Sequence, residues 1–337
     1  SVPALFAADD EALTQEGFIS LTDEDDAFAY PWLPHTDRHY THGIRFSGMS
    51  AFESSTNPPA YLRILGWNGE NEAHSVGAVF GQNMYTPTDI LDPNPIPSDR
   101  PYAGWLYAGP VYQREGRLAP NLYLMDSFAA DFGMVGPDSL AGATQKEFHR
   151  IFFPDDVPAG WHNQVRNEPG LVLKFERTLR WSPTAATARF VDVLPRAGLE
   201  LGNVFTFATA GVTARVGFNL PPDFGEAPID SAGSVNSGLT RHSPWFSFYG
   251  FAGVDGRAVL QNITLDGSWF QGDPSVSKYT WVGDLDYGFA FQFNPHTRYA
   301  PQLEISFTHI ERSLEFHGQN GNDIFAGVTL KANWHFW

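Results

Sequence analysis

The sequence of 337 residues contains no cysteine, which excludes disulfide bonds, thiolate metal sites and thiol nucleophiles. Charged residues make up only 18% of it, below the ~25% of a typical soluble domain. No stretch reaches the ~18 consecutive apolar residues of a membrane-spanning helix. If the chain crosses a membrane, it must do so as a closed β-barrel, because only helices and barrels satisfy every backbone group in lipid.

Basic residues are also scarce, which limits the partners that the chain can bind. The sequence has 21 Lys and Arg residues against 38 Asp and Glu residues, a formal net charge of −17. Such a charge repels polyphosphate backbones, so we expect no nucleic-acid partner. The absence of a G-x-S-x-G elbow, a P-loop and a dinucleotide fingerprint removes the usual support for α/β-hydrolase and nucleotide chemistry.

The abundant residues favour β-structure. Aromatic residues make up 15% of the chain, which 32 Gly and 25 Pro residues punctuate. Apolar and polar residues alternate in several runs, most clearly over 279–293 and 324–336. A soluble sandwich or a lipocalin-like barrel also alternates. The length of the runs, the aromatic residues near their ends and the charges on the opposite face favour a transmembrane barrel with a polar lumen.

We therefore predict an all-β fold, a closed antiparallel transmembrane β-barrel of twelve strands. An even number of strands is typical of bacterial barrels whose termini both lie in the periplasm. The chain ends in aromatic residues, as outer-membrane barrels do, although Trp337 falls on the polar face of the last run. The expected strands cover residues 17–25, 39–52, 74–86, 101–114, 119–132, 170–182, 187–199, 203–218, 245–259, 278–293, 300–313 and 323–337.

No repeat or linker divides the chain, so we expect a single barrel domain over 1–337. It comprises an N-terminal segment, 1–16, and a long extracellular loop, 133–169, that carries site residues. The segment 219–244, rich in Pro, Gly and Ser, would be an unusually long periplasmic turn. A barrel of this kind is expected in the bacterial outer membrane. Because the start at Ser1 suits a processed chain, we also expect its signal peptide to have been removed.

One short helix is expected inside the long loop, over residues 137–153. Asp138 or Ser139 would cap its start, and Pro154 would stop it. Its short buried face would consist of Leu140, Phe148, Ile151 and Phe152.

Two clusters in the first fifth of the chain could carry chemistry. Residues 22–26 include four carboxylates, the oxygen ligands that Ca²⁺ prefers, and a solvated acidic turn is the alternative. The histidines His35, His39 and His42 invite a zinc interpretation, but His39 and His42 would point to opposite faces of a strand. The rest of this cluster could instead line a polar pocket at the rim.

Two further clusters follow. Arg100 could bind an anionic headgroup through its guanidinium fork, or it could be a buried structural residue paired with Asp99. His149 lies in the expected helix, where it could act as a general base, a ligand or a polar contact. Asp155 and Asp156 follow it closely.

Taken in order, these clusters resemble the outer-membrane lipid A 3′-O-deacylase family, whose members remove the 3′-linked acyloxyacyl group from lipopolysaccharide. Each motif is weak alone, whereas the ordered series over residues 24–169 is fairly specific. The matching pieces are Glu24-Asp25-Asp26, Asp37-Arg38-x-Tyr40-Thr41-x-Gly43, Gly81-Gln82-x-x-Tyr85-Thr86-Pro87, residues 99–105, His149-Arg150, and Gly160-Trp161-x-x-Gln164-x-x-Asn167-Glu168-Pro169.

The resemblance implies a twelve-stranded barrel, a Ca²⁺ cofactor and a lipid A or lipopolysaccharide substrate in the outer membrane, and we expect a monomer. It gives catalytic roles to Asp26, Thr41 and His149. Asp25 departs from the family's Asn, and its extra charge could tighten Ca²⁺ binding or weaken activity. The implied metal ligands are Asp26, Asp25 and Asp155, with Asp156 as the alternative to Asp155, and the implied substrate-binding residues are Asp25, Arg38, Tyr40, Arg100 and Gln164.

Two mechanisms fit these residues. In the one that we favour, His149 takes a proton from water while Ca²⁺ polarises the ester carbonyl. In the other, Thr41 is a covalent nucleophile activated by His149. Two other functions stay open: a non-catalytic barrel that serves as a channel or adhesin, and an esterase that acts on phospholipid.

Overall fold

The computed structural model describes residues 15–29, 37–51, 53–54, 70–229, 232–233, 239–240, 244–297 and 300–333. The helical elements in these residues are the 3₁₀ turns η2 (Asp26–Phe28), η3 (Pro137–Ser139) and η4 (Trp161–Asn163) and the helices α2 (Ala141–Phe152) and α3 (Ile263–Asp266). The strands are β1 (Gln15–Glu16), β2 (Phe18–Asp25), β3 (His39–Met49), β4 (Glu53–Ser54), β5 (Glu70–Thr86), β6 (Ala103–Ala119), β7 (Leu122–Val135), β8 (Glu168–Trp181), β9 (Val191–Gly202), β10 (Phe205–Phe218), β11 (Leu239–Thr240), β12 (Phe246–Asn262), β13 (Trp281–Phe293), β14 (Gln302–Arg312) and β15 (Asp323–Asn333).

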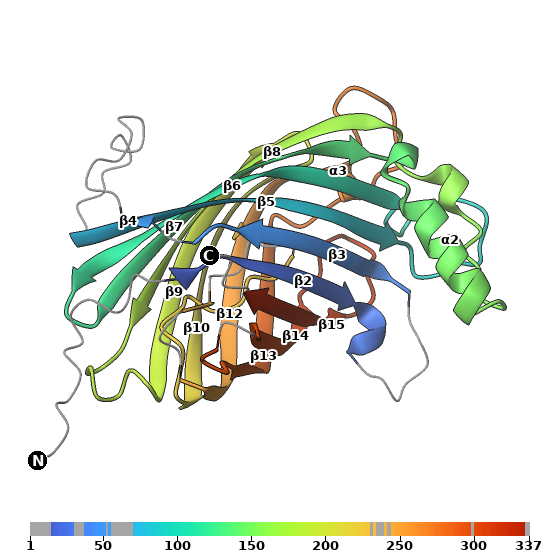
Figure 1. Ribbon diagram of the computed structural model, residues 1–337. Helices are drawn as coiled ribbons and strands as arrows, with labels where there is room; N and C mark the ends of the chain where they lie inside the picture. The colour runs from blue at the N-terminus through green and yellow to red at the C-terminus, as the bar shows by residue number, and fades with distance from the viewer. Residues whose placement is uncertain are drawn as a thin grey trace, which may run out of the picture.

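Twelve long strands of the described chain form one closed antiparallel barrel (Figure 1). Each pairs with its neighbour in the sequence, and β15 closes the ring by pairing with β2. The remaining strands, β1, β4 and β11, have only two residues each. The predicted fold class and number of barrel strands are therefore confirmed.

The alternation in the sequence separates the two faces of the wall. On β2, Ile19 is 57% exposed, whereas Ser20, Thr22 and Glu24 are buried in the lumen. Large apolar side chains stand exposed on the outer face of the other strands as well. An apolar exterior around a polar interior is typical of a transmembrane β-barrel. In the described residues, no helix has both the length and the apolarity needed to cross a membrane.

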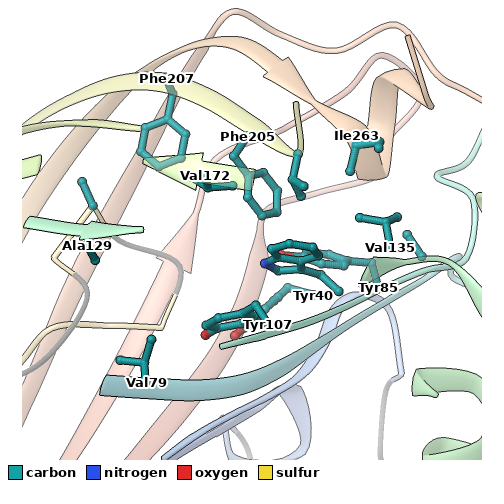
Figure 2. Close-up of a cluster of buried hydrophobic side chains, with 14 of the residues drawn as sticks. Tyr40, Val79, Tyr85, Tyr107, Ala129, Val135, Val172, Phe205, Phe207 and Ile263 are labelled. Atoms are coloured by element: carbon teal, nitrogen blue, oxygen red, sulfur yellow. The ribbon is translucent and has the colours of Figure 1, made fainter. Parts of the chain in front are cut away.

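Side chains fill the lumen. Near the end that carries α2, Tyr40, Tyr107 and Phe205 belong to a buried apolar cluster that joins strands from around the barrel (Figure 2). Further along, buried ion pairs link the strands: Lys331 Nζ lies 2.7 Å from Glu304 Oε1, and Arg215 Nη2 lies 2.7 Å from Asp192 Oδ2. The interior is thus a packed core made of rings and paired charges.

The segment predicted as a long periplasmic turn instead lies in the lumen over its described residues. Arg45 Nη2 donates to the carbonyl of Ala227 at 2.7 Å, and the amide of Ile229 donates to Glu24 Oε1 at 2.8 Å. Arg215 also pairs with Asp223 of this segment. Its length reflects this inward path, which a short turn could not follow.

The predicted helix is present as α2, but the prediction of its buried face was wrong. Leu140 precedes α2 in the left-handed conformation, with φ of 63°, and no side chain caps the helix. The buried residues of α2 are Ala141, Gln145 and His149. Those predicted to be buried stand 49 to 70% exposed: Leu140, Phe148, Ile151 and Phe152.

The reason is the place of α2, which packs against the outer face of the barrel wall. Gln82, on β5, donates to the carbonyl of Ser139 at 2.6 Å, and Met84 packs with Ala141 and Trp161. The helix therefore turns its polar face towards the wall and its apolar face away from it. His35 and the aromatic end, residues 334–337, lie outside the described residues.

Candidate active site

A pocket of about 720 Å³ lies between α2 and the outer face of the wall. Asp25 and His42 are partners on the paired strands β2 and β3, on the same outward face as Ile19. The β7–β8 connection brings α2 to the same end of the barrel (Figure 1). The pocket thus gathers Asp26, Thr41 and His149 from three separate elements, η2, β3 and α2.

The acidic side of the pocket is made by η2 and the residues that follow it. Asp25 Oδ1 accepts a hydrogen bond from the amide of Ala27 at 2.7 Å and so caps η2. Asp26 Oδ2 accepts one from the amide of Arg38 at 2.9 Å. Burial, and then the nearby charges of Asp25 and Asp37, raise the pKa of Asp26 well above its ordinary value. The site therefore favours a positive charge beside Asp26.

His149 faces these acids from α2. Its Nδ1 lies 2.7 Å from the carbonyl oxygen of Asp156, which can only accept, so Nδ1 carries a proton. Its Nε2 lies 3.3 Å from Asp37 Oδ2, and this carboxylate is the main cause that raises the pKa of His149. Nε2 is therefore the nitrogen at which the ring gains or loses its second proton, and Asp37 stabilises the charged ring.

Gln145 positions Asp37. Its Nε2 donates to Asp37 Oδ1 at 3.3 Å, while its Oε1 accepts from Trp161 Nε1 at 2.6 Å. Gln145 and His149 are four residues apart on α2, which places them on one face. Neither Asp37 nor Gln145 was assigned a role from the sequence, although the i, i+4 spacing of Gln145 and His149 and the motif around Asp37 are visible there.

Thr41 lies where the pairing of β3 with β5 shifts its register, between Tyr40 and His42. Tyr40 turns into the lumen and donates to Glu24 at 2.8 Å. Thr41 lines the pocket but is only 3% exposed, and its hydroxyl lies 2.7 Å from that of Thr86. The bulge therefore seats Thr41 in the wall of the pocket.

A second carboxylate–imidazole pair lies on the outward face of the wall. His42 Nε2 is 2.8 Å from Asp23 Oδ1, and both residues line the pocket. His39 contacts other residues. Its Nδ1 lies 2.5 Å from Asp323 Oδ1, and its Nε2 lies 3.4 Å from Asp99 Oδ1. The two histidines thus take part in different contacts.

Other predicted residues lie away from the pocket. Arg100 is 1% exposed in the lumen, where it binds Glu315 at 3.2 Å and Thr264 at 2.7 Å. Gln164 donates to the carbonyl of Trp161 at 2.9 Å. Asp155 is exposed and is not among the lining residues, which do include Asp156, Asp25 and Arg38.

The donor chemistry of the pocket suits a hard cation. In the part of the chain that the structure describes, no three His, Asp or Glu side chains form a ready metal site. Asp25 and Asp26 offer two carboxylates, and Asp37 lines the same pocket. Ca²⁺ accepts carboxylate, carbonyl and water oxygens together, so these residues fit a Ca²⁺ ion that takes its other ligands from water or substrate.

The chain is similar in fold to several solved structures. LpxR from Salmonella typhimurium matches with a TM-score of 0.69 at 18% identity, over 94% of this chain and 100% of that chain. The β domain of the Bordetella autotransporter BrkA gives 0.46 at 8% identity, over 95% and 100%, and the KdgM porin gives 0.39 at 6%, over 94% and 99%.

Identities this low describe the fold alone. No relative is found among curated proteins. The family described as outer membrane protein LpxR, however, matches residues 1–334. The chain therefore belongs to the LpxR family of outer-membrane proteins.

Proposed function

We propose that this protein is a Ca²⁺-dependent hydrolase that removes the 3′-linked acyloxyacyl group from lipid A. The observation that carries the proposal is the pocket on the outward face of the wall, where the His149–Asp37 pair faces Asp26 and Thr41. A lipid in the outer leaflet reaches such a pocket sideways, without entering the packed lumen.

His149 is the proposed general base. Because its Nδ1 proton is held by the carbonyl of Asp156, Nε2 takes the proton from the attacking water. Asp37, 3.3 Å from Nε2, then stabilises the charged ring. General-base catalysis of this kind contributes ~10²- to 10⁴-fold in rate.

Water is the favoured nucleophile. The hydroxyl of Thr41 is already in hydrogen-bond contact with Thr86, and no contact with His149 is found for it in the described residues. A threonine hydroxyl is a poor nucleophile without an adjacent base. Thr41 instead shapes the wall against which the ester lies.

Asp26 and Asp25 are the proposed metal ligands. When bound, Ca²⁺ supplies Lewis-acid stabilisation of the negative charge that develops on the ester oxygen. Asp25 also holds η2 through Ala27, and so keeps the adjacent Asp26 turned into the pocket. Arg38 lines the pocket and donates through Nη2 to the carbonyl of Asn322 at 3.0 Å. The rest of its guanidinium fork can bind a lipid A phosphate.

The test is the mass of lipid A after incubation with the purified protein in detergent, with Ca²⁺ or with chelator. We expect loss of the acyloxyacyl mass only with Ca²⁺, and no loss with His149→Ala. His162→Ala is the matched control, because His162 is exposed on the same connection, 3.2 Å from the carbonyl of Ala159. An unchanged lipid mass in every tube would refute the activity, and cleavage of phospholipid in a parallel tube would redirect it to that substrate.

A channel finds little support. The cavities inside the described barrel include two of about 40 and 20 Å³, room for a few water molecules at most. The 219–229 segment and the ion pairs around Arg215 occupy the lumen.

A further inference from the structure

A second concavity lies on the outer face of the wall, beyond the active-site pocket. It has a volume of about 1,040 Å³ and runs over six neighbouring strands, β13, β14, β15, β2, β3 and β5. We name it the wall groove and define it by its outward residues Leu21, Phe46, Gly48, Phe80, Phe291 and Leu303. A barrel wall is convex towards lipid on average, so a hollow of this size is a specific feature of the wall.

The wall groove continues the active-site pocket along the same strands. On β2, the pocket takes Asp23 and Asp25, and the groove takes Leu21. On β3, the pocket takes His42, and the groove takes Phe46. All five side chains face outwards, so one path leads from the catalytic groups down the wall towards the middle of the membrane.

The length of this path fits a fatty acyl chain. From Asp25 to Leu21 is four residues, or ~14 Å along an antiparallel strand, which at a strand tilt of ~40° is ~10 Å of depth. From Asp25 to Ile19, the partner of Gly48, is six residues, or ~16 Å of depth by the same estimate. One leaflet is half of a hydrocarbon core ~30 Å thick, or ~15 Å. A chain whose ester carbonyl lies in the pocket therefore reaches the groove with its distal part.

The floor of the groove is lowest at Gly48, which has no side chain. Gly48 faces outwards, and a Cβ added there would meet only Ile19 Cγ2 at 3.8 Å and the carbonyl of Phe18 at 3.9 Å. Nothing in the strand pairing requires glycine at this position, whereas Gly77, on the adjacent strand, is tightly enclosed by Gly48 and Met49. The rings of Phe46 and Phe80, 47% and 50% exposed, are cross-strand partners that stand beside this low point, on the side nearer the pocket.

We propose that the wall groove binds an acyl chain of the lipid that is cleaved in the pocket. This assignment rests on the proposed function. Membrane lipid already surrounds the chain, so the groove gains no hydrophobic transfer energy and acts through close packing. Its effect is to hold the chain in line, so that the ester is presented to His149 in one orientation.

Photocrosslinking tests the placement directly. A lipid A analogue with a diazirine at the end of its 3′-linked chain is bound to the full-length His149→Ala variant and irradiated, and labelled peptides are identified by mass spectrometry. We expect labels on β2, β3 and β5, around Leu21, Phe46 and Phe80. Labels spread evenly around the barrel, with the opposite strands β9 and β10 equally marked, would overturn the proposal.

A pair of substitutions tests the contribution to catalysis. Gly48→Leu fills the floor of the groove, and Gly256→Leu is the matched control, since Gly256 is exposed on β12 and its added Cβ would meet only the carbonyl of Ala210 at 4.0 Å. We expect Gly48→Leu to lower kcat/KM for a long-chain ester by about 5- to 10-fold, because the acyl chain then loses about ten atom contacts with the groove. For a short-chain ester, the kcat/KM of Gly48→Leu should equal that of the wild type. For Gly256→Leu, kcat/KM should equal the wild-type value with both the long-chain and the short-chain ester.

The outcomes separate the groove from the activity. If the wild type cleaves the long-chain ester and Gly48→Leu cleaves it equally well, the groove assignment fails and the proposed function survives. An equal loss on both chain lengths also overturns the assignment, because the substitution then disturbs the site itself. If the wild type cleaves neither ester, the proposed function fails and takes the groove's role with it.

Discussion

Replacing Asp37 by Asn tests whether this carboxylate acts through His149. Asp37 Oδ2 lies 3.3 Å from His149 Nε2, and Asp37 Oδ1 accepts a hydrogen bond from Gln145. At that separation two unit charges attract by about 5 kcal/mol for an effective dielectric constant of ~20. The Asp37 side chain is 19% exposed, so water screens part of this attraction. An asparagine keeps the shape and the acceptor for Gln145 but removes the charge.

We expect Asp37→Asn to lower kcat by about 100-fold, because the ring that becomes charged in the transition state loses its partner. KM should change little, since Asp37 is not proposed to bind substrate. The pH profile should also move. Asp37 raises the pKa of His149, and the neutral ring is the active base, so wild-type activity rises as pH increases through that raised pKa. Without the charge the pKa falls, and the rising limb shifts to lower pH.

Initial rates of lipid A deacylation, followed by mass spectrometry across the acidic and neutral range, give both quantities. Asp138→Asn is the control, because Asp138 is an exposed carboxylate on the same connection. If the variant has the wild-type kcat and its activity rises over the same pH range as that of the wild type, Asp37 does not assist His149. The proposed general base would then lose its main structural support.

Three further predictions address the cation, the helix and the lumen. Asp26→Asn should raise the Ca²⁺ concentration needed for half-maximal activity, and chelator should abolish wild-type activity; turnover that is indifferent to chelator would argue against a metal. Gly104→Val should lift the η3–α2 connection from the wall, because an added Cβ would overlap Ser139 and Ala141. Activity should be lost while the heat-dependent gel mobility of the barrel persists, and an active variant would mean that α2 tolerates the shift. Arg215→Ala leaves Asp192 without its buried partner and should destabilise the barrel by ~3–5 kcal/mol in thermal unfolding followed in detergent; an unchanged midpoint would mean that the pair is dispensable.

The barrel could be predicted because its signal is local. Alternation along a strand decides which side chains face lipid, and β13, β14 and β15 follow it closely. The path of 219–229 could not be predicted this way, because it depends on distant partners such as Arg45 and Glu24 that no local pattern connects.

The helix illustrates a different limit. Its presence was predictable, but its orientation was not, because the usual assumption places the apolar face of a helix against the protein. On the outer face of a membrane barrel the assumption reverses for α2: Gln145 and His149 turn to the wall, while Ile151 and Phe152 turn away. Arg100 illustrates a related limit. It was expected to bind substrate but lies in the lumen beside Glu315, because the sequence does not indicate which side of the wall a rim loop covers.

The position of the polar residues on the outer face follows from depth. A charge on the lipid-facing surface costs ~2–4 kcal/mol at the bilayer midplane for Arg or Lys and little near the interface, with less for acids. On β2 the outward acids Asp23 and Asp25 occupy the rim end of the strand, and Ile19 and Leu21 occupy the deeper end. The proposed catalytic groups thus stand near the interface, where charge costs little, and the hydrocarbon-facing wall begins directly below them. A site in the lumen would require the proposed lipid substrate to leave the bilayer, whereas this arrangement lets the packed interior supply rigidity and keeps the proposed chemistry on the outside of the wall.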